Sequence, residues 1–437
     1  MNTKEIVWKV YTDILNQELI PAMGCTEPIA LAYCAAKARD VLGGMPDRVE
    51  IGVSGNIIKN VKSVIVPNTD GLKGIEAAAA AGIVGGNADR VLEVIAEVTP
   101  EQKSAMRDFL AGTPVAVTAL DETAEKLDII VTLYASGDSA KVRIAKYHTN
   151  IVLIEKNHTV LYQEGVIAAD DSVHQPDKGL LNVQDILEFA ENCDIAPLSG
   201  VIQRQLDYNY AIAKEGIEND WGANVGSVLL SAYGDDVKTR ARAWAAAGSD
   251  ARMSGCELPV IINSGSGNQG ITTALPVLVY ARELGVSAEL LHRAMILTDL
   301  IAVHLKTGIG PLSAYCGAIT AGCAAGCGVA YLQEKQKPGA DIFSAIAHTL
   351  VNSLAIVSGI VCDGAKPSCA AKIASAVDAG ILGYEMYIRG QQFYGGEGIV
   401  SKGVENTIHN VGRLGADGMR ETDREIIRIM VGTADSE

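Results

Sequence analysis

The sequence has few large aromatic side chains and no concentration of positive charge. Its 437 residues include only 3 Trp and 4 Phe, and 36 Lys and Arg against 52 Asp and Glu give a formal charge of −16. The basic residues are scattered along the chain, whereas binding a phosphate backbone requires a basic face. We therefore expect no nucleic-acid partner.

Long apolar runs are also missing. The most apolar stretch, residues 294–304, is interrupted by Asp299 and His304 and is too short to cross a bilayer. Near the start, Lys4 and Glu5 stand among apolar residues, which is not the pattern of a signal peptide. These features predict a cytoplasmic protein without a membrane partner.

What the sequence does contain is nine cysteines. Thiols stay reduced in the cytoplasm, so a disulfide framework is not expected. Metal binding, catalysis and simple packing remain as explanations. The short Cys-x-x-Cys spacing that usually indicates a zinc site is absent from the sequence.

The two halves of the chain have different patterns. Four closely spaced segments alternate with period two and predict an antiparallel meander: residues 129–134, 140–145, 149–155 and 159–162. Beyond Pro197 almost every segment has helical spacing, with small residues on much of the apolar face. Since a chain of this length exceeds one typical core, we predict two domains. These are an α+β N-terminal domain with antiparallel strands, residues 1–180, and an all-α C-terminal domain, residues 181–437.

Cys25 lies in a loop, Gly24-Cys-Thr-Glu-Pro28, directly before a predicted helix. The free N–H groups and the dipole at a helix start lower the pKa of a thiol, so the position favours a reactive cysteine. A small residue packed where the chain turns is the alternative.

Five further cysteines lie in two segments of the second half. Cys316, Cys323 and Cys327 are spaced by seven and four residues, which places them on one face of a helix. Cys362 and Cys369 flank Asp-Gly-Ala-Lys-Pro-Ser, which must form a loop because glycine and proline interrupt helices. A loop with two cysteines beside a helix with a third is one way to hold an iron–sulfur cluster, and packing in a core of small residues is the alternative.

A glycine-rich segment, residues 263–270, reads Asn-Ser-Gly-Ser-Gly-Asn-Gln-Gly and leads into a predicted helix. Its backbone N–H groups can bind a carboxylate or a phosphate. It is also similar to the Ser-x-Gly-Asn-x-Gly loop of pyridoxal-phosphate β-eliminases. Against such an enzyme, the first half predicts an antiparallel meander, and Lys59 is the only upstream lysine in a polar, functional-looking context.

Several motifs extend over nearly the whole chain: GCTEP at 24–28, NIIKN at 56–60, HTNI at 148–151, SDARM at 249–253, NSGSGNQGI at 263–271, CDGAKPSC at 362–369 and GEGIV at 396–400. Together they resemble the L-cysteine desulfidase family, previously an uncharacterised family, which is related to the iron–sulfur L-serine dehydratase α chain. The resemblance implies a serine-dehydratase-α-like C-terminal domain. It also implies an oxygen-sensitive 4Fe-4S lyase that converts L-cysteine to pyruvate, ammonia and sulfide without pyridoxal phosphate.

By the pattern of the related dehydratases, Cys316, Cys362 and Cys369 are the expected cluster ligands. Cys323 or Cys327 would replace Cys316 if the helix had a different register. Three protein thiolates leave one iron with an open Lewis-acid position, where the leaving group of the substrate is expected to bind.

The resemblance also requires a base and a binding site for the substrate carboxylate. Cys25 as a thiolate is the first candidate base, and a role as fourth cluster ligand stays open. His148 is the second candidate, with a structural histidine as the alternative, and Glu27 joins this candidate catalytic set or only completes the helix start. The carboxylate is assigned to Ser264, Gly265, Ser266, Asn268 and Gln269, with Asn56, Lys59 and Asn60 as further contributors. Asp250 and Arg252 are interpreted as a structural ion pair.

Several functions remain open from the sequence. The first is the iron–sulfur cysteine lyase, with L-serine dehydration as a close variant that differs in the leaving group. The others are a pyridoxal-phosphate lyase and a non-enzymatic iron–sulfur or thiol sensor. The expected partner is a small amino acid, and a homodimer is compatible with a helical domain rich in small residues.

Overall fold

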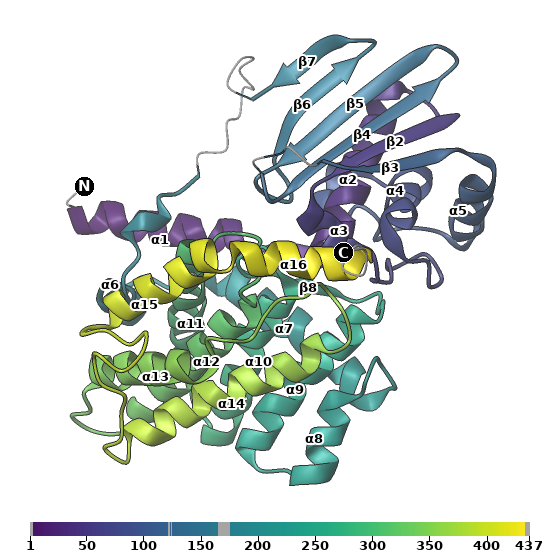
Figure 1. Cartoon of the computed structure of the whole chain (residues 1–437). Coiled ribbons are helices and arrows are strands. Elements are labelled where there is room, and N and C mark those ends of the chain that lie inside the picture. The colour runs from purple at the N-terminus through teal and green to yellow at the C-terminus, as the bar shows by residue number, and fades with distance from the viewer. Residues whose placement is uncertain (1–2, 121–122, 124, 165–174, 433–437) are drawn as a thin grey trace.

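The computed structural model describes residues 3–120, 123, 125–164 and 175–432. These residues form a mixed sheet flanked by helices and, below it, a larger helical body (Figure 1). The predicted fold class, an α+β N-terminal region followed by a mostly helical region, is confirmed.

The sheet has the strand order β3-β2-β4-β5-β6-β7. Its strands are β2 (Arg48–Val53), β3 (Val115–Ala119), β4 (Asp128–Ala135), β5 (Asp138–Ala145), β6 (Ile151–Lys156) and β7 (Thr159–Gln163). The predicted meander is the antiparallel run from β4 to β7. The sequence did not predict β3, which pairs in parallel with β2 and whose residues are exposed or half-buried, so that its apolar pattern is weak.

The helices beside the sheet are rich in alanine. Helix α2 packs against α4, β4 and β5, and residues such as Leu31 and Ile83 in this layer are fully buried. The further elements of the first half are α1 (Thr3–Glu18), β1 (Pro21–Met23), α2 (Thr26–Leu42), α3 (Gly55–Val61), α4 (Gly74–Gly85), η1 (Ala88–Glu93), α5 (Pro100–Gly112) and η2 (Lys178–Leu180).

The helical body is built around α12, which packs against α10, α11, α13 and α14. Small residues allow close contact of these helices: a Cβ on Gly326 would lie 2.5 Å from the carbonyl oxygen of Gly380. The helices are α6 (Val183–Asn192), α7 (Ala196–Glu218), α8 (Val225–Tyr233), α9 (Val237–Met253), α10 (Gly267–Leu284), α11 (Ala288–Ile309), α12 (Gly317–Glu334), α13 (Ile342–Val357), α14 (Cys369–Tyr387), α15 (Val404–Arg413), η3 (Leu414–Gly418) and α16 (Arg420–Val431).

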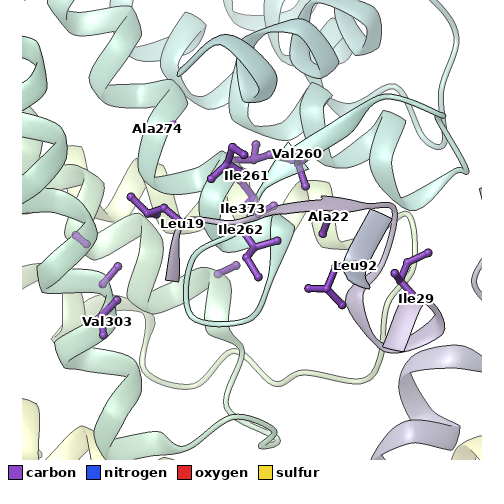
Figure 2. Packing of buried hydrophobic residues seen from close by; sticks show 14 of the residues in the cluster. Leu19, Ala22, Ile29, Leu92, Val260, Ile261, Ile262, Ala274, Val303 and Ile373 are labelled. Carbon is purple, nitrogen blue, oxygen red and sulfur yellow. The ribbon is translucent and has the colours of Figure 1, made fainter. Parts of the chain in front are cut away.

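The two regions are joined by a short ribbon. Strand β1 pairs antiparallel with β8 (Pro259–Ile261), with Ala22 opposite Val260. The sequence predicted an all-α second region, and β8 is a short strand within that mostly helical region. Figure 2 shows buried apolar side chains around this ribbon. Helix α1 packs on α7 and α11, while α16 contacts α3. Elements from both ends of the chain therefore fix the junction between the regions.

None of the helices in the part of the chain that the structure describes combines the length and the apolar character that a membrane span requires.

Candidate active site

A cavity of about 100 Å³, here called the cysteine cavity, lies where the two regions meet. Its lining includes Cys25, Cys316, Cys362 and Cys369. These cysteines come from the residue before α2, the residue before α12, the loop after α13 and the first residue of α14. The structure thus brings the three expected cluster ligands together with the first candidate base.

Backbone hydrogen bonds hold Cys316 and Cys362 side by side. The N–H of Cys316 donates to the carbonyl of Ile360 at 3.2 Å, and that of Cys362 donates to the carbonyl of Ala314 at 2.6 Å. Burial, together with the nearby Cys362 and Cys369 thiols, raises the pKa of the Cys316 thiol to about 12. All three cysteines line the same small cavity.

The other two cysteines of the same segment lie elsewhere. Cys323 and Cys327 are on α12 in the helical core, fully buried and outside the lining of the cavity. The Cys327 Sγ lies 3.7 Å from the carbonyl oxygen of Ile346. Because α12 begins only at Gly317, Cys316 precedes the helix and is the member of this group that reaches the cavity.

Four helices begin at the cysteine cavity, namely α2, α10, α12 and α14. The residues before them are Cys25, Ser266, Cys316 and Ser368, and within the described residues their side chains make no capping hydrogen bond. The first N–H groups of a helix need partners from outside the helix, and its N-terminal end carries partial positive charge. The surroundings of the cavity therefore favour an anion.

Arg252, at the end of α9, also lines this cavity. Its residue is 2% exposed, and its Nε and Nη2 atoms have no hydrogen-bond partner among the residues that the structure describes. The interpretation of Arg252 and Asp250 as an ion pair was wrong. Asp250 instead accepts a hydrogen bond from the N–H of Gly226 at 3.3 Å, and burial raises its pKa to about 6.

Cys25, Glu27 and His148 form a line of polar side chains. The Cys25 Sγ donates to Glu27 Oε2 at 3.1 Å, and His148 Nε2 lies 3.9 Å from Glu27 Oε1. Burial and the neighbouring Glu27 raise the pKa of the Cys25 thiol well above its usual value, although Arg252 opposes this. The expected lowering by the helix start was therefore wrong, because burial outweighs it. Burial alone would also raise the pKa of Glu27, but His148 and Cys25 lower it to about 2.

A second cavity of about 210 Å³, here called the histidine cavity, adjoins the first. Both are lined by Lys306 and Pro311, and His148 lines the second. The glycine-rich segment is divided between them. Ser264 and Gly265 line the histidine cavity, whereas Ser266, Asn268 and Gln269 line the cysteine cavity.

The segment Asn56–Asn60 has two different roles. The side chains of Asn56 and Lys59 donate to the carboxylate of Asp423 on α16, at 2.9 and 2.5 Å. Asn60 lines the cysteine cavity. The structure therefore brings Asn60 to the candidate site, and it uses Asn56 and Lys59 to attach the last helix.

The sequence analysis did not identify two cationic residues of the site, Arg252 and Lys306, as functional. Arg252 was interpreted as structural, and Lys306 was not selected. Lys306 lies within the apolar helix α11, where burial lowers its pKa to about 8 although Cys362 opposes the shift. A charge inside an apolar helical segment was the available signal for Lys306.

Cys316, Cys362 and Cys369 supply the kind of donor that an iron–sulfur cluster requires. Among the described residues, no three His, Cys, Asp or Glu side chains are arranged to hold one metal ion. Iron–sulfur clusters, in contrast, are bound by cysteine thiolates through several iron atoms, so the sulfur atoms need not meet at a point. Three cysteines that line one cavity, together with helix starts that have no side-chain cap in the described part of the chain, suit such an anionic group.

Comparisons with known proteins found a matching family model and several similar proteins. The family model of the serine dehydratase alpha chain matches residues 89–428. The chain is 57% identical over 436 residues to a UPF0597 protein of Desulfitobacterium hafniense, with 100% of both chains covered. It is 51% identical to a UPF0597 protein of Lachnoclostridium phytofermentans, covering 97% of this chain and 100% of that one. A UPF0597 protein of Treponema denticola is 46% identical, with 96% and 97% covered. The matched range of the family model contains Cys316, Cys362 and Cys369.

Proposed function

Because this chain belongs to the serine dehydratase alpha chain family, we propose that it is a 4Fe-4S lyase that eliminates sulfide from L-cysteine and yields pyruvate and ammonia. Membership of the family indicates a lyase of the serine dehydratase type, and the proposal adds the cluster and the substrate. The observation that carries it is the convergence of Cys316, Cys362 and Cys369 on a cavity that Cys25 also lines.

The three cysteines would hold the cluster, which when bound supplies an iron that acts as a Lewis acid on the leaving group. One cation lies beside these cysteines. Lys372 lies close enough to lower the pKa of the Cys316 thiol, against the larger effect of burial. Its Nζ donates to the carbonyl of Val361 at 2.8 Å, which fixes it beside Cys362.

Cys25, Glu27 and His148 would handle the proton of the α-carbon. In the resting arrangement Cys25 keeps its proton on Sγ and donates it to Glu27. For Cys25 to accept a proton, its own must first move to Glu27 and then toward the unpartnered Nε2 of His148. Since His148 also borders the histidine cavity, this line gives the proton a way out of the cysteine cavity.

The start of α10 would stabilise negative charge on the substrate as the α-proton leaves. Preorganised donors do this without rearrangement during the reaction. Ser266 precedes the free N–H groups of this helix, and the Oδ1 atom of Asn268 is buried without a partner among the described residues, so it can accept from the substrate ammonium group. Gln269 is placed by contacts with Ser264 at 3.5 Å and Thr320 at 3.4 Å.

The test is anaerobic reconstitution with iron and sulfide, followed by sulfide and pyruvate assays with L-cysteine and L-serine. Sulfide and pyruvate in equal amounts from L-cysteine are expected. Pyruvate from L-serine alone would change the assignment to an L-serine dehydratase, the activity that the matched family model favours. A fully loaded protein that converts neither substrate would favour a sensor. A Schiff-base absorption band that borohydride abolishes would favour a pyridoxal-phosphate enzyme.

An oxygen-sensitive cluster also requires reducing surroundings, so we propose that the protein acts in the cytoplasm.

A further inference from the structure

Resting on the proposed function, we infer that Arg252 binds the α-carboxylate of the substrate and makes the site specific for amino acids with a free carboxylate. Arg252 lines the cysteine cavity from the last turn of α9. Two of its three guanidinium nitrogens are buried without a hydrogen-bond partner in the described part of the chain. The unfilled donors point to a ligand that supplies acceptors.

A buried guanidinium stays charged, and burying a charge without a partner is costly. The neighbouring buried cations illustrate the usual solution. Lys59 forms an ion pair with Asp423, and the Lys306 Nζ donates to the carbonyl of Gly310. Arg252 has no ion pair within the described residues. Asp250, two residues away in the sequence, accepts from Gly226, and Glu27, which lines the same cavity, accepts from Cys25. The missing counter-ion is therefore expected to arrive with the substrate.

The position of Arg252 suits a carboxylate in particular. The guanidinium packs against the first residue of α10, because a Cβ on Gly267 would lie 2.3 Å from Arg252 Nε. Two coplanar N–H groups of arginine match the two oxygens of a carboxylate, and an uncapped helix start adds further donors. Arg252 and the start of α10 thus form one binding surface for one carboxylate.

This surface also orients the α-carbon. Arg252 lies close enough to Cys25 to act on the charge of its sulfur, and Cys316, Cys362 and Cys369 line the same small cavity. A substrate fixed by its carboxylate at Arg252 would place its α-carbon toward Cys25 and its β-substituent toward the three cysteines. Amines that lack the carboxylate would lose this orientation.

The test compares Arg252→Gln and Arg252→Lys with Arg242→Gln as a matched control. Arg242 is on the same helix, and its Nη1 lies 3.6 Å from Asp378 on α14, outside the cysteine cavity. For L-cysteine, Arg252→Gln is expected to raise KM at least about 10-fold, since a charge-assisted hydrogen bond is lost. Arg252→Lys should recover part of this loss, and Arg242→Gln should leave KM unchanged.

A second measurement does not depend on activity. Binding of L-alanine and of L-alaninamide to the cluster-free protein is followed by calorimetry, with circular dichroism as a check of folding. Arg252→Gln should weaken L-alanine at least about 10-fold and leave L-alaninamide unchanged. Equal binding of L-alanine by wild type and Arg252→Gln would overturn the inference. If loaded wild type converts no amino acid, the proposed lyase function fails, and this binding comparison still decides the role of Arg252.

Discussion

Five helices that begin away from the cysteine cavity differ in their first turn from the four helices that begin at it. In α5, α6, α9, α11 and α13 a side chain before the helix accepts a hydrogen bond from a first-turn N–H; these residues are Thr99, Asn182, Asp236, Ser287 and Asp341. At the four helices that begin at the cavity, the corresponding side chains make no such bond within the described residues. Other helices that begin away from the cavity, among them α4, α7 and α8, also lack a side-chain cap within the described residues. What distinguishes the cavity is that four such starts meet there, so that their donors are available to one ligand.

Residue choice explains part of this difference. Ser, Thr, Asp and Asn are the preferred capping residues because their oxygen atoms accept well, and replacing them typically costs about 1 kcal/mol of stability. Two of the four positions at the cavity carry cysteine, Cys25 and Cys316, whose sulfur is a weak acceptor. Under the proposed function, cysteine at these two positions exchanges capping stability for a thiol at the cavity.

The strongest test of the comparison removes the thiols at the cavity. Serine in place of Cys316, Cys362 or Cys369 should prevent cluster assembly and reduce sulfide release from L-cysteine by about 1,000-fold or more, because the cluster supplies the leaving-group chemistry. The matched control is Cys323→Ala on the buried face of α12, which should retain iron. Iron content and the visible absorption of the reconstituted protein check both. Full iron in all three serine variants would refute the ligand assignment.

The next test concerns Asp299, which lies beneath the start of α10. Burial raises the pKa of Asp299 to about 6, although hydrogen bonds from Gln205 and Asn263 oppose this. Because the pKa is higher in the folded than in the unfolded protein, the folded state binds the proton more tightly. This contribution to stability is full below about pH 4 and falls as pH rises through about 6, by roughly 3 kcal/mol in total.

Asp299→Asn should remove that decline. The difference in the free energy of unfolding, variant minus wild type, is expected to grow by roughly 3 kcal/mol from about pH 4 to pH 7, because only wild type loses this contribution. Urea denaturation at both pH values measures it. Parallel stability profiles of the two proteins would show that Asp299 is ionised in the folded state without penalty.

The sequence predicted elements that depend on neighbouring residues and missed contacts between distant residues. Local alternation and helical spacing identified β4 to β7 and most of the helices, because these patterns depend on neighbouring residues. The ribbon of β1 and β8 joins residues 21–23 to 259–261, and such a distant pairing leaves no local signal. The attachment of Lys59 to Asp423 was missed for the same reason.

For the candidate site, the sequence shows the type of each residue but not its burial or its contacts. The resemblance to the dehydratases selected Cys316, Cys362 and Cys369 as ligands, and the position before a helix selected Cys25 as a reactive thiol. The structure brings these four residues to one cavity. The interpretation of Arg252 failed because residues two apart on a helix do not face each other, and both Asp250 and Arg252 lie on α9. The direction of the Cys25 pKa shift depends on burial, which the sequence does not show.

A smaller effect is expected from adding a cap at the cavity. Ser266 has extended backbone angles, φ −135° and ψ 130°, that suit a capping residue. In Ser266→Asp the new carboxylate should accept from the first turn of α10 and raise the stability of the cluster-free protein by about 1 kcal/mol. It should also occupy the place of the substrate carboxylate and raise KM for L-cysteine about 10-fold or more. Unfolding and steady-state kinetics test both; a stabilised variant with unchanged KM would contradict the idea that this helix start is kept for the substrate.

The smallest effect is expected at a surface cap. Asp236 accepts from the N–H groups of Lys238 and Thr239 at 2.9 and 3.1 Å, and the bonds from Thr239 lower its pKa. Asp236→Ala should cost about 1 kcal/mol at neutral pH and leave kcat and KM unchanged. Because the pKa is lower in the folded protein, this stability is present above about pH 4 and is lost as pH falls through the folded value. Denaturation curves of wild type and variant should therefore converge in acid, whereas a loss of activity without a loss of stability would mean that capped helix starts also serve the reaction.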